Sequence, residues 1–546
     1  MTNRSLGSTK ESLLFFSPFS GNWKAALAEH QIMKSLARDF DVFDIRCDEY
    51  FREFCTVMNA KRLEISSDEK SKKKICQSCI KNTEILKSKK IQTRNVSKSL
   101  FMDAEYIKLQ KDITDTDVSK LIHQKFRELN IGKLSIFETI IKYKKINFQF
   151  EPIQLLHYRT KLLHAAKSVL IAEEILDEIK PNAIFIFSPE YAVTGAFAEF
   201  CISKGFRVYG IHFAANANEI FQTVQIFDWK KYKLRLPSLE YWNSEQVSVS
   251  GSALNRIKKH LPALRDPHAA FVYSSQKSGA SIRKNFGIPD GNKLVLLAMN
   301  SYDEVFANFT SGLSEYDPTN GRNFKNQIEW VEKTMDFFER LEGVSLVIRP
   351  HPREFPNKRD SAKSEHVKLW EDLFTNLPSN VYLDSPELKN SVFDHFSEID
   401  CLVTGWSAVG LEAMFHGIPC VTFDDRLPPF PSSIHFSGST ADEYYKNLLL
   451  GINTGRSEKI RADAHKWAAY NWVSGSVRTS GQMRDFPIIK NIRILRRAID
   501  FFGTRYPNYT KLIEARIGWV GHDREKIVNL IRNRNDSFLE IRKAEA

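Results

Sequence analysis

Two polar segments with the residue types of a phosphate-binding site follow apolar runs in the second half of this 546-residue chain. The first, Arg349–Glu354 (RPHPRE), gathers cations directly after Val344–Ile348. The second, Thr404–Ala413 (TGWSAVGLEA), follows Cys401–Val403 and places hydroxyl groups at the start of an expected helix, whose free N–H groups and dipole favour anions. Because ligands bind at the carboxyl ends of strands in open parallel α/β sheets, these segments predict a pocket for a phosphate-bearing molecule such as a nucleotide.

The elements that position these segments alternate between strand and helix, as in doubly wound domains. In the first half we expect these strands and helices: strands Leu13–Phe16, Asp41–Ile45, Ala183–Phe187 and Arg207–His212, and helices near Trp23–Arg38, Leu162–Ile179 and Thr194–Lys204. In the second half the expected strands are Lys293–Met299, Val344–Arg349, Val381–Leu383, Asp400–Thr404 and Pro419–Phe423. The predicted fold class is α/β, with two doubly wound Rossmann-like domains.

The length of the chain predicts two domains, because single cores rarely grow beyond roughly 250–300 residues. We expect a first domain at 1–280, with a charge-rich helical insertion at about 51–158, and a nucleotide-binding domain at 281–456. A basic helical tail follows at 457–546. The start of the chain is polar and no apolar run approaches the roughly 18 residues of a membrane span, so we expect a cytoplasmic protein.

Four short motifs punctuate the second domain. They are Asn300–Asp303 (NSYD), Arg349–Pro352 (RPHP), Ser407–Ala413 (SAVGLEA) and Gly417–Cys420 (GIPC). Their spaced combination resembles the GT-B glycosyltransferases of bacterial capsule and surface-polysaccharide biosynthesis, including the capsule β-Kdo transferases. The resemblance covers roughly Lys293–Asp424 and extends to the N-terminal half only as architecture. It implies a GT-B enzyme whose transfer needs no metal cofactor, with Asn300 and Asp303 in the donor site.

The cationic segment suits a departing phosphate. His351, held by the following proline, has the chemistry to donate to a phosphate oxygen as negative charge develops. Arg349 and Arg353 offer bidentate phosphate contacts. The alternatives are an ordinary packing role for His351 and pairing of the arginines with carboxylates such as Glu354.

The second segment suits the rest of a nucleotide. Thr404 and Gly405 permit close approach of an anion to the backbone, and Ser407 is expected at a helix N-cap, a position that serine also takes for structural reasons alone. The resemblance implies that Glu412 accepts hydrogen bonds from the ribose hydroxyls of the donor. A solvated helix carboxylate is the alternative.

The catalytic base is expected from the first domain. Glu190, His212 and Asp48 each follow an expected strand, so all three belong to the ligand-binding edge of the sheet. Glu190 is the first choice among them. For each residue an ordinary loop role is the alternative.

Four N-terminal cysteines suggest a separate metal centre. Cys47, Cys55, Cys76 and Cys79 form the pattern C-x7-C-x20-C-x2-C, which has the ligand count of a structural zinc site or an iron–sulfur cluster. Disulfides are not expected in a cytoplasmic protein. Four unconnected thiols are the alternative.

The net charge of +12 (78 basic against 66 acidic residues) is concentrated in the range Lys70–Lys98. We interpret this range as a solvated insertion or as a patch for an anionic membrane surface, which would make the protein peripheral at the inner face of the cell membrane. It lacks the interleaved aromatic residues of a nucleic-acid-binding site, so no nucleic-acid partner is expected.

Taken with these features, the resemblance implies a glycosyltransferase. It would move a sugar from a nucleotide-activated donor, CMP- or UDP-linked, to a growing or lipid-linked surface polysaccharide of the capsule or lipopolysaccharide type. Three rival functions stay open: a CDP-glycerol-type polyol-phosphate transferase, a nucleotide-sugar epimerase and a non-catalytic assembly scaffold.

Overall fold

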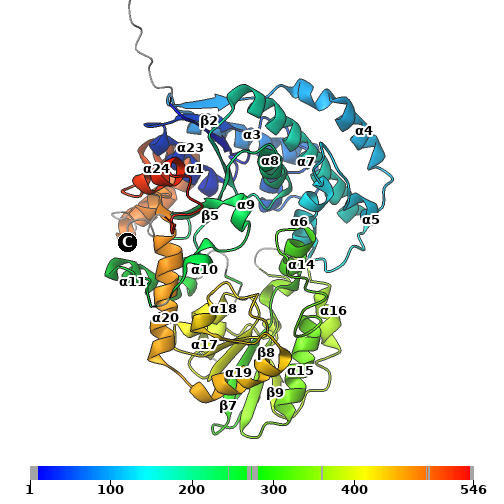
Figure 1. Cartoon of the computed structure of the whole chain (residues 1–546), viewed down its shortest axis with the longest axis vertical. Helices are drawn as coiled ribbons and strands as arrows, with labels where there is room; N and C mark the ends of the chain where they lie inside the picture. The colour runs from blue at the N-terminus through cyan, green and yellow to red at the C-terminus, as the bar shows by residue number, and fades with distance from the viewer. Residues whose placement is uncertain are drawn as a thin grey trace, which may run out of the picture.

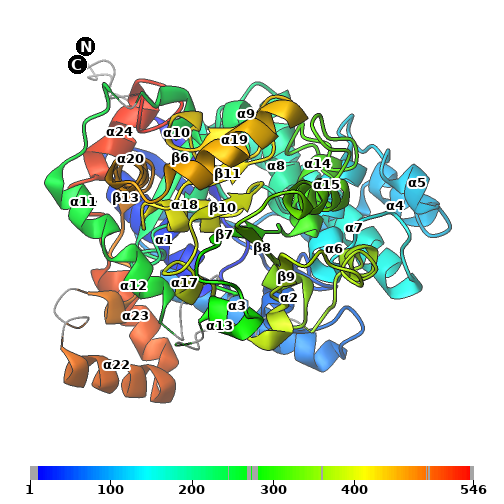
Figure 2. The same cartoon turned by 90° about the horizontal axis from the view of Figure 1, so that it is seen from below.

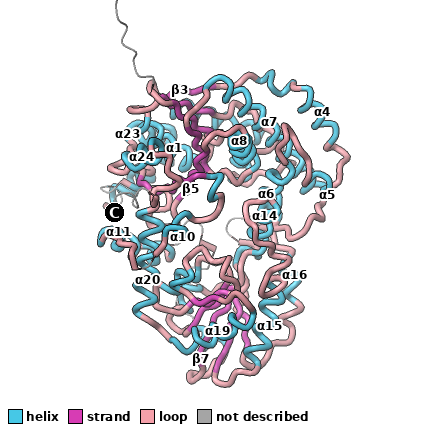
Figure 3. Tube along the Cα trace, viewed as in Figure 1, coloured by secondary structure: helices cyan, strands magenta, loops and turns pink. Residues whose placement is uncertain are grey.

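The protein consists of two α/β units stacked along its long axis, each built on its own sheet (Figures 1 and 3). The computed structural model describes residues 10–243, 245–266, 272–273, 279, 281–357, 361–486, 489 and 492–540. Two doubly wound domains were predicted, and the structure confirms them. Within the described residues, no helix is long and apolar enough to cross a bilayer.

The first sheet has the strand order β13-β6-β5-β4-β1-β2-β3. Its strands are β1 (Ser12–Phe16), β2 (Asp41–Ile45), β3 (Ile91–Arg94), β4 (Ala183–Phe187), β5 (Val208–Phe213), β6 (Thr223–Asp228) and β13 (Val477–Arg478). Strands β1 to β5 are parallel to their neighbours, β6 is antiparallel to β5, and β13 is antiparallel to β6. The order reverses between β1 and β4, so the loops after these two strands flank the crevice where ligands bind in such sheets.

Strand alternation divides the first core between the two faces of this sheet. Leu14 and Phe16 pack on one face with α7 (Pro152–Ile179) and α8 (Ala192–Ser203). Leu13 and Phe15 point to the other face, which α1 (Trp23–Leu36) and α24 (Arg524–Arg532) cover. A strand buried on both faces reads as a continuous apolar run, which is why the sequence SLLFF predicted β1.

The second sheet is entirely parallel, with the order β12-β11-β10-β7-β8-β9. Its strands are β7 (Lys293–Ala298), β8 (Val344–Arg349), β9 (Val381–Leu383), β10 (Cys401–Thr404), β11 (Cys420–Thr422) and β12 (Phe436–Ser437). The order reverses between β7 and β10. Its flanking helices include α14 (Tyr302–Thr310), α15 (Gln327–Glu339), α16 (His366–Glu371), α17 (Val392–His395), α18 (Val409–Met414) and α19 (Ala441–Thr454).

The expected insertion is mostly helical but also supplies a strand. Its helices are α2 (Thr56–Ala60), α3 (Glu69–Leu86), α4 (Ala104–Asp112), α5 (Val118–Leu121) and α6 (Ile131–Tyr143). Between them β3 pairs with β2 and extends the sheet, which the sequence analysis did not predict. The sequence IQTR has a single aliphatic side chain, so β3 carries no hydrophobic signal of its own.

The C-terminal segment crosses from the second unit back to the first. Helix α20 (Glu458–Ala469) leads into β13, which pairs with β6, and α23 (Pro507–Ile517) and α24 then pack on α1. Trp23 Nε1 donates to Glu514 Oε2 of α23 at 2.7 Å. Figure 1 shows α20 running between the two units and α23 and α24 beside α1.

A second connection joins the units on the opposite side, where α14 packs on α6. Tyr302 and Phe306 of α14 belong to the apolar core of the first unit. Arg353 donates to the Ile141 carbonyl at 2.9 Å, and Lys145 pairs with Glu365. The two units are therefore joined at both ends of the space between them.

The tail contact gives a stability prediction. The Glu514 carboxylate accepts hydrogen bonds from Trp23 Nε1 and from the Met483 N–H at 2.9 Å. Glu514→Ala leaves two buried donors without an acceptor, so the free energy of unfolding should fall by about 1–3 kcal/mol in chemical denaturation. Arg516→Ala, on the exposed side of α23, is the control and should stay within roughly 0.5 kcal/mol of wild type. Equal losses in the two variants would contradict this role.

Candidate active site

A cavity of about 1290 Å³ lies between the two units. The first unit lines it with the loops that follow β1, β4 and β5, and the second unit lines it with α18 and the Pro429–Phe430 segment. The loops after β1 and β4 flank the reversal point of the first sheet, and α18 follows β10 at the reversal point of the second. The ligand-binding edges of the two sheets thus meet at one cleft.

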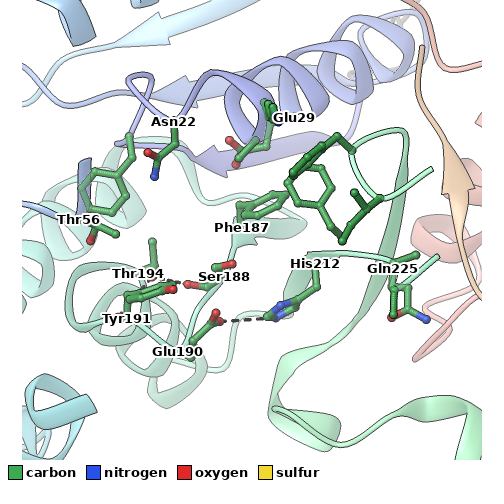
Figure 4. A pocket seen from close by; sticks show the side chains of 18 of the residues that line it. Asn22, Glu29, Thr56, Phe187, Ser188, Glu190, Tyr191, Thr194, His212 and Gln225 are labelled. Carbon is green, nitrogen blue, oxygen red and sulfur yellow. Dashed lines mark hydrogen bonds and ion pairs between the residues drawn. The ribbon is translucent and has the colours of Figure 1, made fainter. Parts of the chain in front are cut away.

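Two of the three predicted base candidates meet in this cleft. Glu190 Oε2 and His212 Nε2 lie 3.7 Å apart, and the two side chains point toward each other, Glu190 from the loop after β4 and His212 from the end of β5 (Figure 4). Both atoms are buried and neither has a hydrogen-bond partner within the described residues. Buried polar atoms are nearly always hydrogen-bonded, so this pair is suited to receive a polar ligand group.

The backbone around this pair is unusual in a way that the sequence does not show. Ser188, two residues before Glu190, has φ +52°, a left-handed conformation that is costly for a non-glycine residue. Thr194 Oγ1 donates to the Ser188 carbonyl at 2.7 Å and stabilises this turn (Figure 4). The turn aims Glu190 into the cleft.

Aromatic stacking holds the imidazole of His212. Its ring is nearly parallel to those of Phe227, at 5.6 Å between centroids, and Trp229, at 6.0 Å. Phe227 belongs to β6, which the sequence analysis did not predict, and Trp229 begins the next helix, α9 (Trp229–Tyr232). The ring plane of His212 is therefore fixed while Nε2 stays directed at Glu190.

The third base candidate lies elsewhere. Asp48 does not line the cleft, and its half-exposed carboxylate lies 3.8 Å from Lys98 Nζ. Although it follows β2 at the correct edge of the sheet, β2 is not next to the reversal point. Among the three candidates, the structure brings Glu190 and His212 together and leaves Asp48 apart.

A buried carboxyl that the sequence analysis missed also lines the cleft. Glu29 on α1 accepts a hydrogen bond from Ser17 Oγ at 2.6 Å and is only 3% exposed. Burial raises its pKa to about 7, although Arg46 and Ser17 act in the opposite direction. The Arg46 guanidinium is in turn hydrogen-bonded to Asp44 at 2.8 Å. The signal available in the sequence was a glutamate on the apolar side of an otherwise regular helix.

On the opposite wall, Glu412 is the predicted donor residue that reaches the cleft. Burial raises its pKa to about 7. Ser407 precedes α18, whose N-cap is Ala408, and its Oγ accepts the Val409 N–H at 3.4 Å. The hydroxyl therefore caps the helix start from one position earlier than expected.

Asn300, Thr404 and Gly405 form a buried connection behind this wall. Asn300 Oδ1 accepts hydrogen bonds from Thr404 Oγ1 at 3.2 Å and from the Trp406 N–H at 3.0 Å. A Cβ added at Gly405 would lie 2.9 Å from Asn300 Nδ2. The structure brings these three predicted residues together, and here they fix the loop after β10 to the loop after β7.

The predicted cationic residues are engaged inside the protein. Arg349 pairs with Asp384, and Arg353 donates to Asp303 at 2.8 Å. The His351 Nδ1 accepts the Arg353 N–H at 3.3 Å, and burial lowers the pKa of His351 to about 4. The cleft is lined by none of the four predicted donor-site residues in this group, which are Asp303, Arg349, His351 and Arg353. Arg353 and Asp303 instead join the two units.

The cations that do line the cleft come from elsewhere in the chain. They are Lys24, Lys61, Lys233, Arg235 and Lys511. The first four belong to the first unit and Lys511 to the returning tail. Sequence reasoning missed them because they are scattered along the chain, whereas the RPHPRE segment is compact.

The four N-terminal cysteines do not form a ready-made metal cage. Among all described residues, no group of three or more His, Cys, Asp or Glu side chains is placed to hold a metal ion. Burial raises the pKa values of all four thiols, to about 11 for Cys76 and about 12 for Cys79. Cys79 Sγ accepts the Gly21 N–H at 3.0 Å, and Cys76 packs with Phe54 and Met58. A zinc or iron–sulfur centre stays a prediction, to be tested by elemental analysis.

Two Rossmann-like domains facing each other across a ligand cleft have the GT-B architecture. No protein-family model matches the chain, and no curated protein matches it. Among solved structures it is similar to KpsC, the β-Kdo 2,4 transferase of Thermosulfurimonas dismutans, with 12% identity over 53% of this chain and 79% of that chain and a TM-score of 0.34.

Two further solved structures are also similar to the chain. A UDP-GlcNAc 2-epimerase of Methanocaldococcus jannaschii, in complex with UDP-GlcNAc and UDP, shares 11% identity over 84% of this chain and 98% of that chain, with a TM-score of 0.29. The glycosyltransferase SnogD of Streptomyces nogalater shares 9% identity over 85% and 96%, with a TM-score of 0.26.

The raised pKa of Glu29 predicts a pH dependence of stability. A carboxyl whose pKa rises from 4.5 to about 7 on folding binds its proton more tightly in the folded state. Its contribution is therefore complete below pH 4.5 and is lost as the pH rises to about 7. The loss amounts to roughly 3 kcal/mol, since one pKa unit corresponds to about 1.4 kcal/mol.

Urea unfolding across this pH range should show the slope in wild type and a flatter profile in Glu29→Gln. Glu11→Gln is the control, because Glu11 is exposed at the edge of the same unit. A Glu29→Gln profile as steep as that of wild type would assign the slope to other groups.

Proposed function

We propose that the protein is a glycosyltransferase that moves a sugar from a nucleotide-activated donor to a hydroxyl group of a glycan acceptor. The observation that carries this proposal is the Glu190–His212 pair: the two facing atoms have no hydrogen-bond partner within the described residues, and the pair lines the same cleft as Glu412 of the second unit. A transfer between two substrates requires a base for the acceptor, here the Glu190–His212 pair, and a binding site for the nucleotide donor, here the start of α18.

The proposed reaction uses a base from the first unit and a donor bound to the second unit. The acceptor hydroxyl binds at the Glu190–His212 pair, where His212 Nε2 takes its proton and Glu190 stabilises the resulting imidazolium. The acceptor oxygen forms a bond to the anomeric carbon while the bond from that carbon to the donor phosphate breaks. The electron pair leaves with the phosphate, whose charge is met by the lining cations, among them Lys24 and Arg235.

The donor is proposed to lie on the second unit. Glu412 would accept hydrogen bonds from ribose hydroxyls, and Ser407 and the loop after β10 lie next to it at the start of α18. The donor is proposed to be CMP- or UDP-linked and the acceptor a capsule- or lipopolysaccharide-type glycan, in line with the motif resemblance. Thermal shifts with CMP, UDP and GDP would select the base, and a panel of nucleotide sugars would then select the sugar.

The first test concerns the base. General acid–base groups contribute about 10²- to 10⁴-fold, so Glu190→Gln and His212→Gln should each lower acceptor-dependent turnover by at least about 10²-fold with unchanged nucleotide binding. Asp48→Asn, outside the cleft, should stay close to wild type.

Turnover of the donor without any acceptor would instead favour an epimerase, and nucleotide binding without any turnover would favour a scaffold. A phosphodiester product would favour the polyol-phosphate transferase.

The second test concerns the donor wall. At a pH above the raised pKa of Glu412, which is about 7, Glu412→Ala should weaken binding of the selected nucleotide by about tenfold or more in calorimetry, because a charged hydrogen bond contributes about 1.5–3 kcal/mol. Asp442→Ala on the exposed side of α19 is the control in the same unit. Unchanged affinity in Glu412→Ala would remove this residue from the donor site.

A further inference from the structure

Helix α22 (Arg493–Arg505) is strongly amphipathic, yet its apolar side faces solvent. Ile494, Ala498 and Phe501 follow each other at helical spacing, and Leu495, Ile499 and Phe502 form a parallel row beside them. Ile494 is 79% exposed and Phe501 is 72% exposed. A helix at the surface of a globular protein normally turns such a stripe toward the core, so this stripe is suited to an external apolar phase.

The opposite side of α22 is polar and carries two arginines. Arg496, Arg497, Asp500 and Thr504 are exposed and share that side. Together the two sides have the composition of a helix that lies in a membrane interface, with apolar side chains inserted and arginines near the headgroups. The next helix, α23, adds Tyr509, which is 66% exposed, and Trp519 follows it at 48%. Aromatic residues of this kind favour the headgroup region.

The position of α22 relates this surface to the cleft. Helix α22 packs on α23, and α23 packs on the basic helix α3. Figure 2 shows α22 standing out from the body beyond α23. On α3, Lys70, Lys73, Lys74 and Lys81 are exposed. The cleft is lined by Ser78 and Asn82 of α3 and by Lys511 of α23. The helices that form this surface therefore also form part of the cleft wall.

We propose that α22 is an interfacial helix that seats the protein on an anionic lipid bilayer, with α3 supplying additional positive charge. The sequence analysis placed membrane contact in the range Lys70–Lys98 alone. In the present proposal the apolar side chains that insert into the bilayer come from α22, in the C-terminal segment. This inference rests on the proposed function: the surface would bring lipid-linked acceptors to the side of the cleft that α3 and α23 line.

Charge complementarity favours a bilayer over a second copy of this chain. A second copy would bring its own arginines and α3 lysines against these, and like charges in contact disfavour association. An anionic headgroup layer matches both the arginines of α22 and the lysines of α3, at about 1 kcal/mol per basic residue near the surface.

The first experiment measures co-sedimentation of the full chain with vesicles of phosphatidylglycerol and phosphatidylcholine, against phosphatidylcholine alone. Wild type should bind the anionic vesicles and lose affinity as salt rises. Ile494→Ser/Phe501→Ser should bind about tenfold more weakly or worse, because interfacial binding scales with the apolar area inserted. Met102→Ser/Leu388→Ser, two apolar residues of comparable exposure on other elements, should bind like wild type.

The second experiment reverses charge. Arg496→Glu/Arg497→Glu should also weaken binding about tenfold and flatten its salt dependence, while Lys108→Glu/Lys111→Glu on the exposed side of α4 is the matched control. All variants should keep wild-type turnover with a water-soluble acceptor, so failure of membrane binding is distinguishable from failure of the transferase proposal. Equal binding to neutral vesicles would overturn the proposal, as would unchanged binding by the α22 variants. A wild-type dimer that Ile494→Ser/Phe501→Ser converts to monomer, without effect on vesicle binding, would assign the surface to a second copy.

Discussion

The contact between α6 and α14 is the constraint on which the cleft depends. Tyr302 and Phe306 of α14 are buried in the same core as Ile136 and Ile140 of α6. Arg353 extends this contact, because its guanidinium donates to the Ile141 carbonyl of α6 and pairs with Asp303 of α14. The side chains of Arg353 and Asp303 are 7% and 0% exposed, so removing either partner would strand a buried charge. The two ligand-binding sheet edges are thereby held facing each other.

This use of Arg353 and Asp303 changes how the second domain is understood. A compact cluster of cations after a strand suggests phosphate binding, but here Arg349 and Arg353 each have a buried carboxylate within reach. The ion pairs neutralise charge that a phosphate would otherwise meet. The lining cations of the first unit and the tail, Lys24 and Lys511 among them, have their side chains in the cleft. Burial lowers the pKa of both lysines, which fits a site where charge has been removed from bulk water.

The sequence predicted those parts of the fold that carry a strong local signal. Strands β2, β4, β8 and β9 have the expected bounds, because each contains several apolar residues that give it a local signal. Strand β6 was missed although it is six residues long and lies between β5 and β13. Strands β3, β12 and β13 were also missed, since they are two to four residues long and lie at sheet edges, where pairing depends on distant chain segments. The same reason limited the site. Glu190 follows the predicted strand β4 and His212 lies near the end of β5, whereas Glu29 is in the cleft only because α1 packs beside β1.

The C-terminal segment connects the exposed helix α22 to the cleft through helix α23. Helix α23 holds α22 on one side and α1 on the other, where Trp23 donates to Glu514 and Lys34 Nζ donates to the Ala515 carbonyl at 2.9 Å. Trp23 itself lines the cleft. A bilayer seated on α22 would therefore be two helices away from the cleft wall, with buried polar contacts along the way. These contacts support the proposed membrane contact, because the helix proposed to lie on the bilayer is held by a helix that also lines the cleft.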